Sequence, residues 1–223
     1  DAGYEFGRLP QPNPGELAVI SNANTTAPAS WAVTKVTLTG LANVLYPTDP
    51  EPEYVSINSA NKALVSLQEN NAFIVVDLAT PTVDADFSAG DVSLVDIDTE
   101  ENKLIELKDD QPTRLREPDG VTWIDTDYFA SANEGDMDGG SRGFTIFEID
   151  ELNLVETYES FESFDYLQAM HGHYPEERSE NKGNEPEAVT YVPNFDGEGL
   201  ELLMVASERS NTVVVYDISE KDS

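Results

Sequence analysis

The sequence predicts an all-β protein, namely a β-propeller built from four-stranded antiparallel blades. Three observations predict this fold: a motif that occurs three times, short runs of alternating apolar and polar residues bounded by turns, and scarce helix signals. The copies begin at Glu51, Glu117 and Glu185, 66 and 68 residues apart. Each copy has Glu-Pro-acid, then Val and Ser or Thr, a strand-like run that reaches a Glu, and a last run that ends in Asp. Such repeats indicate blades.

The chain before the first copy differs from the rest. Residues 1–16 are rich in Gly and Pro and are expected to form an extended arm. Strands are expected at Leu17–Ser21 and at Trp31–Thr39, where β-branched residues alternate with other types. We therefore divide the chain into an N-terminal arm with first strands, residues 1–50, and blades over residues 51–223.

The first copy shows the expected blade most clearly. Strands are predicted at Tyr54–Ile57, Ala63–Leu67 and Ala72–Leu78, with Asn- and Ser-rich turns between them. A fourth, edge strand is predicted at Val83–Phe87. The run Phe73–Val76 is entirely apolar, which favours a strand that neighbouring blades cover on both faces.

The spacers between copies carry further elements. Strands are expected at Val92–Val95, Lys103–Leu107 and Leu152–Tyr158, and one short helix at Phe161–Met170. The polar run His171–Asn184 is long for a compact loop, which marks it as functional or mobile. In total we count roughly 16 strands, or about four blades, whereas propellers have about four to eight. The chain is therefore expected to form a partial ring of a larger propeller, either an open arc or a ring finished by another chain.

The composition restricts the partners. Lys and Arg number 12 and Asp and Glu 44, which gives a formal net charge of −32. This charge argues against nucleic acid and against anionic membrane surfaces, because both require clustered basic residues. Divalent cations are the natural partners of such a surface, and dispersed acidity also suits solubility in high salt. The chain has no Cys and no apolar run long enough for a membrane helix. It begins at Asp1, which is compatible with a processed mature protein or a piece of a longer one.

Repeated acids form the first candidate site. Acids begin each copy (Glu51, Glu53, Glu117, Asp119, Glu185 and Glu187), and a Glu ends the second strand of each (Glu69, Glu134 and Glu208). In a propeller, equivalent positions would converge around the axis at one end of the ring. Converging carboxylates repel unless a cation or an Arg lies among them, and hard oxygen ligands suit Ca²⁺. The alternative is structural: each Glu caps backbone amides or pairs with an Arg.

Two acidic loops are further candidates for Ca²⁺. Glu134, Asp136 and Asp138 alternate before Gly139 and Gly140, a spacing that lets a loop wrap an ion with carboxylate and carbonyl oxygens. Asp96 and Asp98 show the same alternation. The alternative for both loops is a solvated acidic turn.

His171 and His173 are the only His residues, and two His at this spacing can bind Zn²⁺ with a carboxylate as third ligand. A polar loop is the alternative. No Gly-x-Ser-x-Gly elbow and no phosphate-binding Gly pattern is present, which argues against a Ser nucleophile and a nucleotide site.

A set of segments resembles the choice-of-anchor I family of secreted and surface-anchored β-propellers. The matching segments, in the family's order, are residues 51–79, 116–124, 130–136, 139–148, 181–191 and 205–219. Family members are also described as mesenchyme-specific cell surface glycoprotein-like, and some as alkaline phosphatase-like. The last copy is also similar to esterase-like phytase and lactonase propellers. The resemblance implies a propeller fold and an extracellular or cell-surface location, and it supports fold better than function.

Two functions follow as hypotheses. The first is a secreted or cell-surface binding or scaffold protein that Ca²⁺ stabilises, with a surface polymer or a ring-completing chain as a further partner. The second is a metal-dependent hydrolase, acting on a phosphoester or a lactone at the propeller axis. There Ca²⁺ would activate a water molecule, with Glu134, Asp136 or His173 as general base.

Overall fold

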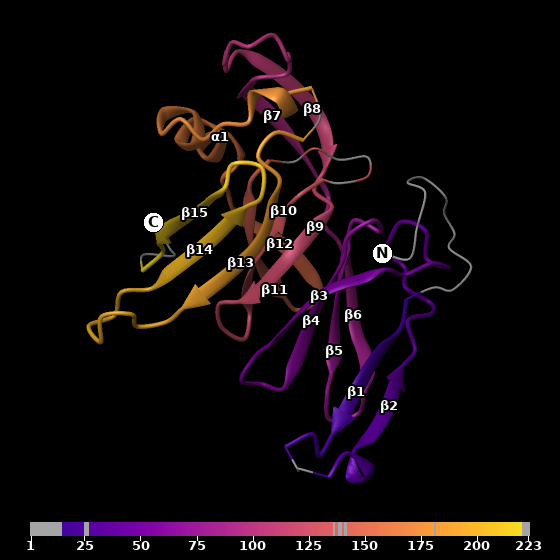
Figure 1. The fold of residues 1–223 in the computed structure, drawn as a ribbon. Helices are drawn as coiled ribbons and strands as arrows, with labels where there is room; N and C mark the ends of the chain where they lie inside the picture. Colours follow the sequence, from indigo (N-terminus) through magenta and orange to yellow (C-terminus); the bar gives the residue numbers. More distant parts are fainter. Residues whose placement is uncertain are drawn as a thin grey trace.

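The structure, a computed structural model, describes residues 15–24, 27–135, 137, 140, 142–180 and 182–219, the side chains of 161–163 excepted. Every strand pair among these residues is antiparallel. The fold is all-β with one α-helix, and its main sheets have the strand order of propeller blades (Figure 1). The predicted fold class is thus confirmed, and the described sheets form an open series.

The three copies of the motif form three sheets, which we call blades 1, 2 and 3. Blade 1 contains β3 (Pro52–Ile57), β4 (Lys62–Leu67), β5 (Ala72–Asp77) and β6 (Thr82–Ser88). Blade 2 contains β9 (Pro118–Trp123), β10 (Tyr128–Asn133), β11 (Phe144–Asp150) and β12 (Asn153–Glu159). Blade 3 contains β13 (Pro186–Val192), β14 (Leu202–Ser207) and β15 (Thr212–Asp217), three strands in the described part of the chain.

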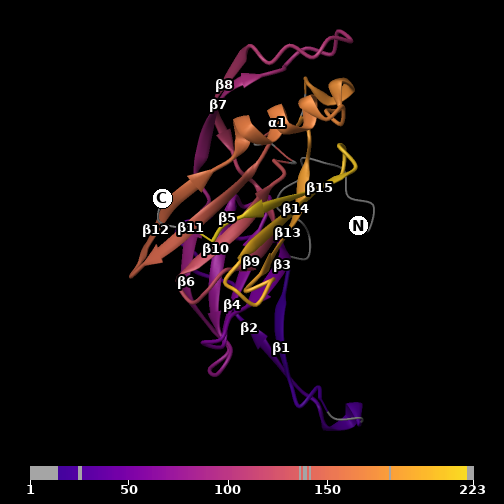
Figure 2. The same cartoon turned by 90° about the vertical axis from the view of Figure 1, so that its left-hand side faces the viewer.

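Two hairpins stand outside the blades. β1 (Leu17–Ser21) pairs with β2 (Ala32–Val36), and a 3₁₀ turn at Pro28–Ser30 precedes β2. β7 (Asp91–Ile97) pairs with β8 (Asp109–Leu115) and rises beyond the ends of the blades (Figure 2).

The prediction of a strand at Lys103–Leu107 is wrong, because these residues lie in the loop between β7 and β8. The side chain of Asp98 closes this loop by accepting hydrogen bonds from the backbone N–H groups of Glu100 (3.1 Å) and Glu106 (3.2 Å). The strand that pairs with β7 is instead the polar segment β8, so the apolar pair Leu104 and Ile105 is left exposed. The prediction relied on apolar content alone and therefore placed the strand in the wrong segment.

Three apolar layers hold the sheets together. The first joins blade 1 to β1, β2 and the segment that follows them; the second joins blades 1 and 2; the third joins blades 2 and 3. Blade 1 is therefore covered on both faces, and β5 is buried over Ala72–Val76 as its apolar run predicts. Phe73 anchors the second layer through edge-on contacts with Phe129 and Phe147, at centroid distances of 5.0 and 5.4 Å.

The helix α1 (Phe161–Met170) and the segment after it lie across the ends of the blades (Figure 2). Phe164 packs into the third apolar layer, and the Gln168 amide donates to Thr212 Oγ1 of β15 at 2.7 Å. The predicted helix has its predicted limits.

A fully buried arginine anchors this region. The Arg142 guanidinium donates to the carbonyl of Asp98 (3.0 Å), to the Tyr174 hydroxyl (2.8 Å) and to the carbonyl of Ser179 (2.6 Å). It also forms an ion pair with buried Asp165 at 3.2 Å. Arg142 thus ties β7, α1 and the predicted polar loop 171–184 to blade 2. Tyr174 and Ser179 are buried, so much of that loop is structural.

Candidate functional site

The first strands of the three blades lie side by side, with β9 in contact with both β3 and β13. β9 and β13 approach each other closely at Gly120, where an added Cβ would stand 2.6 Å from the Glu187 carbonyl oxygen. Only Gly fits so close an approach. The residues next to this contact, Asp119 on β9 and Glu187 on β13, are each the acid of a Glu-Pro-acid motif. The close packing therefore brings two repeat acids to one place.

Four carboxylates interact around this point, and we call them the inner acids: Glu69, Asp119, Glu187 and Glu208. Burial, with Glu69 as a nearby negative charge, raises the pKa of Asp119 to about 6. Burial, hydrogen bonding to Glu208 and the charges of Glu208 and Asp119 raise the pKa of Glu187 to about 7. Glu69 and Asp119 belong to different blades, as do Asp119 and Glu187, so the like charges oppose each other across both blade junctions.

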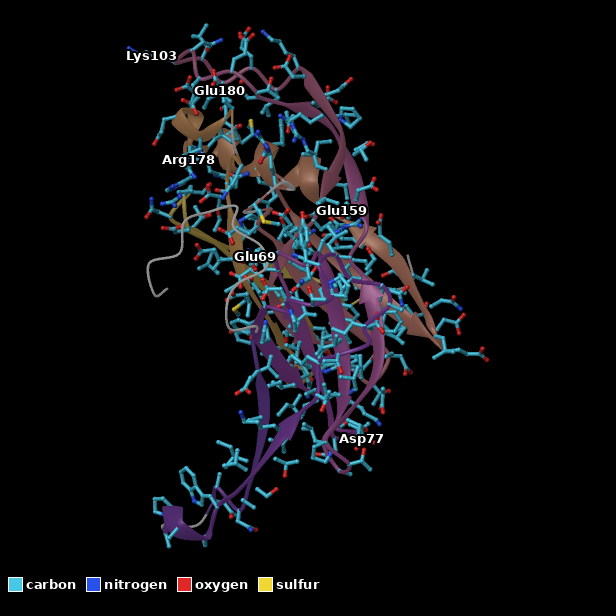
Figure 3. All side chains as sticks on the ribbon, turned by 90° about the vertical axis from the view of Figure 1, so that its right-hand side faces the viewer. Glu69, Asp77, Lys103, Glu159, Arg178 and Glu180 are labelled. Atoms are coloured by element: carbon cyan, nitrogen blue, oxygen red, sulfur yellow. The ribbon has the colours of Figure 1, made fainter. Side chains whose placement is uncertain are left out.

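The inner acids come from two kinds of position. Asp119 and Glu187 are the second residues of β9 and β13, while Glu69 and Glu208 lie in the turns β4–β5 and β14–β15. Glu69 lies at one end of β5 and Asp77 at the other (Figure 3). The inner acids therefore lie at one end of the blades.

The strand registers correct one expected equivalence. Pro118 pairs with Asn133 and Pro186 with Ser207, so Glu134 and Glu208 directly follow equivalent residues. Pro52 pairs with Leu67, which is followed by Gln68. Glu69 therefore stands one residue later than Glu134 and Glu208. The turns 68–71 and 208–211 have the same length, so Glu69 is the second residue of its turn, whereas Glu208 is the first. Gln68 occupies the equivalent place.

Glu134 uses its carboxylate in a contact between blades. Its Oε2 accepts a 2.5 Å hydrogen bond from the Gln68 amide, so the equivalent turn positions of blades 1 and 2 touch. Asp136 and Asp138, predicted with Glu134 as a Ca²⁺ loop, lie outside the described residues.

The first Glu of each Glu-Pro motif has a structural role in blades 2 and 3. Glu117 and Glu185 are almost fully buried and have left-handed backbones, with φ of 42° and 49°. The Glu117 carboxylate accepts the Met137 N–H at 2.6 Å. The Glu185 carboxylate binds Arg178 and, at 2.6 Å, Arg209. Capping and Arg pairing, the alternative that the sequence left open, therefore account for these two acids.

The remaining candidates are dispersed. Asp96 is exposed, whereas Asp98 is buried and occupied with the β7–β8 loop. His171 and His173 are exposed at the end of α1, and the His173 N–H donates to the Gln168 carbonyl. Among the described residues, no group of three or more His, Asp or Glu side chains is arranged to hold a metal ion. The chemistry of the inner acids, all carboxylate oxygens, nevertheless fits Ca²⁺.

Asp119 and Glu187 belong to the repeated acids of the sequence analysis, which did not single them out as metal ligands. The signal that could have placed them is Gly120. It follows an acid inside a strand, where Gly marks a close backbone approach. The position next to such an approach is where acids of adjacent strands meet.

The comparison with protein families agrees with this architecture. The model of the choice-of-anchor I domain matches residues 22–139 and 137–221, nearly the whole described chain. The chain belongs to the choice-of-anchor I family. Membership of a choice-of-anchor family indicates a surface-anchored protein. No curated protein matches the chain. Within the described residues, no helix has the length and apolar character needed to cross a membrane.

Proposed function

We propose that this choice-of-anchor I chain is a cell-surface scaffold whose blades Ca²⁺ locks together at the inner acids. The observation that carries the proposal is the meeting of like-charged carboxylates across both blade junctions, with the pKa of Asp119 raised to about 6 and that of Glu187 to about 7. Two unit charges 4 Å apart repel by about 4 kcal/mol at an effective dielectric constant of about 20. A dication between such groups turns that repulsion into attraction.

Glu69, Asp119, Glu187 and Glu208 would reorient around the ion on binding, with Glu134 as a neighbouring ligand, because their side chains are not grouped for a metal ion in the described structure. The ion would supply charge neutralisation and a link between strands of different blades. The protein's own contribution is the fixed backbone approach at Gly120, which positions Asp119 beside Glu187. An extracellular location suits this role, because Ca²⁺ is abundant there and extracellular modules bind it with dissociation constants of about 10⁻⁴–10⁻³ M.

Thermal melting in EDTA, in millimolar CaCl₂ and in NaCl of matched ionic strength tests the proposal. An ion that binds only the folded state adds about 2.7 kcal/mol when its concentration is about a hundred times Kd. We expect CaCl₂ to raise the melting temperature by several degrees above the NaCl value. The double variant Asp119→Asn with Glu187→Gln should lose most of that difference.

A matched control removes the same charge elsewhere. Asp150 and Glu198 are exposed, so Asp150→Asn with Glu198→Gln should leave the Ca²⁺ effect intact. Asp136→Asn tests the acidic loop separately: if this variant alone loses the effect, the ion binds at the loop and not at the inner acids. Coincident CaCl₂ and NaCl curves for the wild-type chain would refute the calcium proposal.

A metal-dependent hydrolase is the second candidate, favoured by the pKa of Glu187 near neutrality. A carboxyl that gains and loses a proton near pH 7 suits general acid–base catalysis. Turnover of aryl phosphates and lactones, with and without CaCl₂, tests this role. Glu187→Gln should abolish any activity found, and an absence of turnover on both substrate classes would leave the scaffold role alone.

A further inference from the structure

The β7–β8 hairpin, which we call the arm, projects from the series of blades. It joins β6 of blade 1 to β9 of blade 2 and rises beyond the ends of the blades (Figure 2). Its buried apolar residues, Val92, Leu94 and Ile97, form a small cluster of their own. The layers that join the blades lie between blade faces, so a further blade would extend that series and would not cover the end of the arm.

Hydrogen bonds fix the loop at the end of the arm. Besides the Asp98 carboxylate, which closes the loop, the side-chain oxygen of Asn102 accepts the Leu104 N–H at 2.9 Å. The Lys103 N–H donates to the carboxylate of Glu176, which lies in the 3₁₀ turn after α1. The loop is therefore held from within and by a segment far away in the sequence.

This fixed loop holds two neighbouring aliphatic side chains in solvent. Leu104 is 60% and Ile105 44% exposed. The hydrogen bonds that order the loop use backbone groups and polar side chains, and do not involve these two side chains. A partner that covers the pair gains the burial of both side chains without first ordering the loop.

The surroundings of the aliphatic pair are acidic. Residues 96–110 contain seven Asp or Glu and two Lys, and residues 176–180 add three Glu and one Arg. Figure 3 shows Lys103 and Glu180 at the same end of the molecule. Lys108 already pairs with Glu106 at 3.0 Å. The loop thus presents an aliphatic pair within a negative field, which attracts a cationic partner and repels a second copy of this acidic chain.

We propose that the arm loop binds a cationic amphipathic segment of another protein. Apolar side chains of that segment would lie against Leu104 and Ile105, and its Lys or Arg residues against the surrounding acids. Amphipathic segments bind through apolar anchors, while complementary charges select the partner and speed the encounter. An anionic lipid surface is disfavoured for the same reason as a second copy. This inference does not depend on the calcium proposal, and it is tested in EDTA.

Fluorescence anisotropy with three labelled model peptides of about 14 residues tests the proposal in about 0.1 M NaCl. The first peptide has Leu on one face of a helix and Lys on the other. The second has Glu in place of Lys, and the third has Ser in place of Leu. We expect the wild-type chain to bind the Leu–Lys peptide at least about tenfold more tightly than either of the others, because only this peptide offers both apolar anchors and positive charge.

A charge-neutral variant separates the loop from the general attraction of an acidic protein for Lys. Leu104→Ser with Ile105→Ser should reduce the affinity for the Leu–Lys peptide to that for the Ser–Lys peptide. The matched control, Leu152→Ser with Val155→Ser, removes two aliphatic side chains of the β11–β12 hairpin that are 79% and 41% exposed. This control should bind the Leu–Lys peptide within about twofold of wild type.

A second pair of variants tests the charge of the arm. Glu101 and Asp110 are exposed on the arm, and Asp150 and Glu198 are exposed elsewhere. Glu101→Gln with Asp110→Asn should weaken binding of the Leu–Lys peptide by more than Asp150→Asn with Glu198→Gln does, since charges act mainly within a Debye length of about 10 Å.

Three results would overturn the proposal. The first is a wild-type chain that does not prefer the Leu–Lys peptide, and the second is equal binding by the Ser variant of the loop and its control. The third is a wild-type chain that dimerises in sedimentation equilibrium while the Ser variant of the loop stays monomeric, because a second copy would then be the occupant. Circular dichroism verifies that every variant is folded.

Discussion

At the scale of single residues, the inner acids show how one backbone contact sets the chemistry of side chains. Gly120 lets β9 and β13 touch, and this contact places Asp119 beside Glu187. Burial and repulsion between the carboxylates then raise the pKa of both Asp119 and Glu187 above their ordinary values. In blades 2 and 3 the motif acids thus have two roles: the first Glu pairs with Arg or with a backbone amide, and the third residue lies near other carboxylates.

The raised pKa values predict how stability depends on pH. Asp119 and Glu187 bind protons more tightly when folded, with pKa values of about 6 and 7 against ordinary values of 3.8 and 4.5. Their ionisation therefore destabilises the folded state as pH rises through this window, and protonation relieves it. In EDTA we expect the melting temperature to rise as pH falls from about 8 to about 5. Asp119→Asn with Glu187→Gln should flatten this rise.

Glu159 and Asp165, with pKa values raised to about 7 and about 6 by burial, add to the pH dependence with the same sign. The informative quantity is therefore the difference between wild type and variant in how much the melting temperature rises as pH falls. The exposed control pair, Asp150→Asn with Glu198→Gln, should follow the wild-type pH curve. If the inner-acid variant also follows it, the inner acids do not repel each other in solution.

At the scale of elements, sequence patterns located strands well where apolar and polar residues alternate between turn residues. The strands of blade 1 and helix α1 lie where they were predicted. The pattern failed at Lys103–Leu107, because a buried Asp98 side chain, and not apolar content, organises that loop. It also gave no indication that Arg142 would be buried, since its partners come from Asp98, Asp165 and residues 174–179, far apart in the sequence.

The Arg142 anchor predicts a large effect from one substitution. Arg142→Met removes the partner of fully buried Asp165 and leaves several buried acceptors without their donor. Breaking a buried pair on one side costs about 3–5 kcal/mol. Chemical denaturation should show that loss, and limited proteolysis should cut within residues 171–185 first. Adding Asp165→Asn should restore part of the stability, because no buried negative charge then remains. Equal stability of Arg142→Met and wild type would contradict the anchoring role.

At the scale of the whole molecule, the three copies of the motif predicted the blades, and the open series of sheets agrees with a partial ring. The sequence could not reveal which blade faces are covered, because similar runs of apolar residues form β5 and β15. β5 reads Ala-Phe-Ile-Val-Val-Asp and is buried on both faces, while β15 reads Thr-Val-Val-Val-Tyr-Asp, is half-buried on one face and is exposed on the other. Burial here depends on neighbouring sheets and not on the strand's own residues.

A matched pair of substitutions, at Val75 and at Val215, tests this difference in burial between β5 and β15. They are the same residue type at equivalent strand positions, 8% and 52% exposed. Val75→Ala should lower the free energy of unfolding by about 2 kcal/mol, because it opens a space in the layer between blades 1 and 2. Val215→Ala should change it by less than about 0.5 kcal/mol.

Urea denaturation of the two variants measures both losses of unfolding free energy. Equal losses for Val75→Ala and Val215→Ala would contradict the difference in burial between the two faces, and would mean that the outer face of blade 3 is covered in solution.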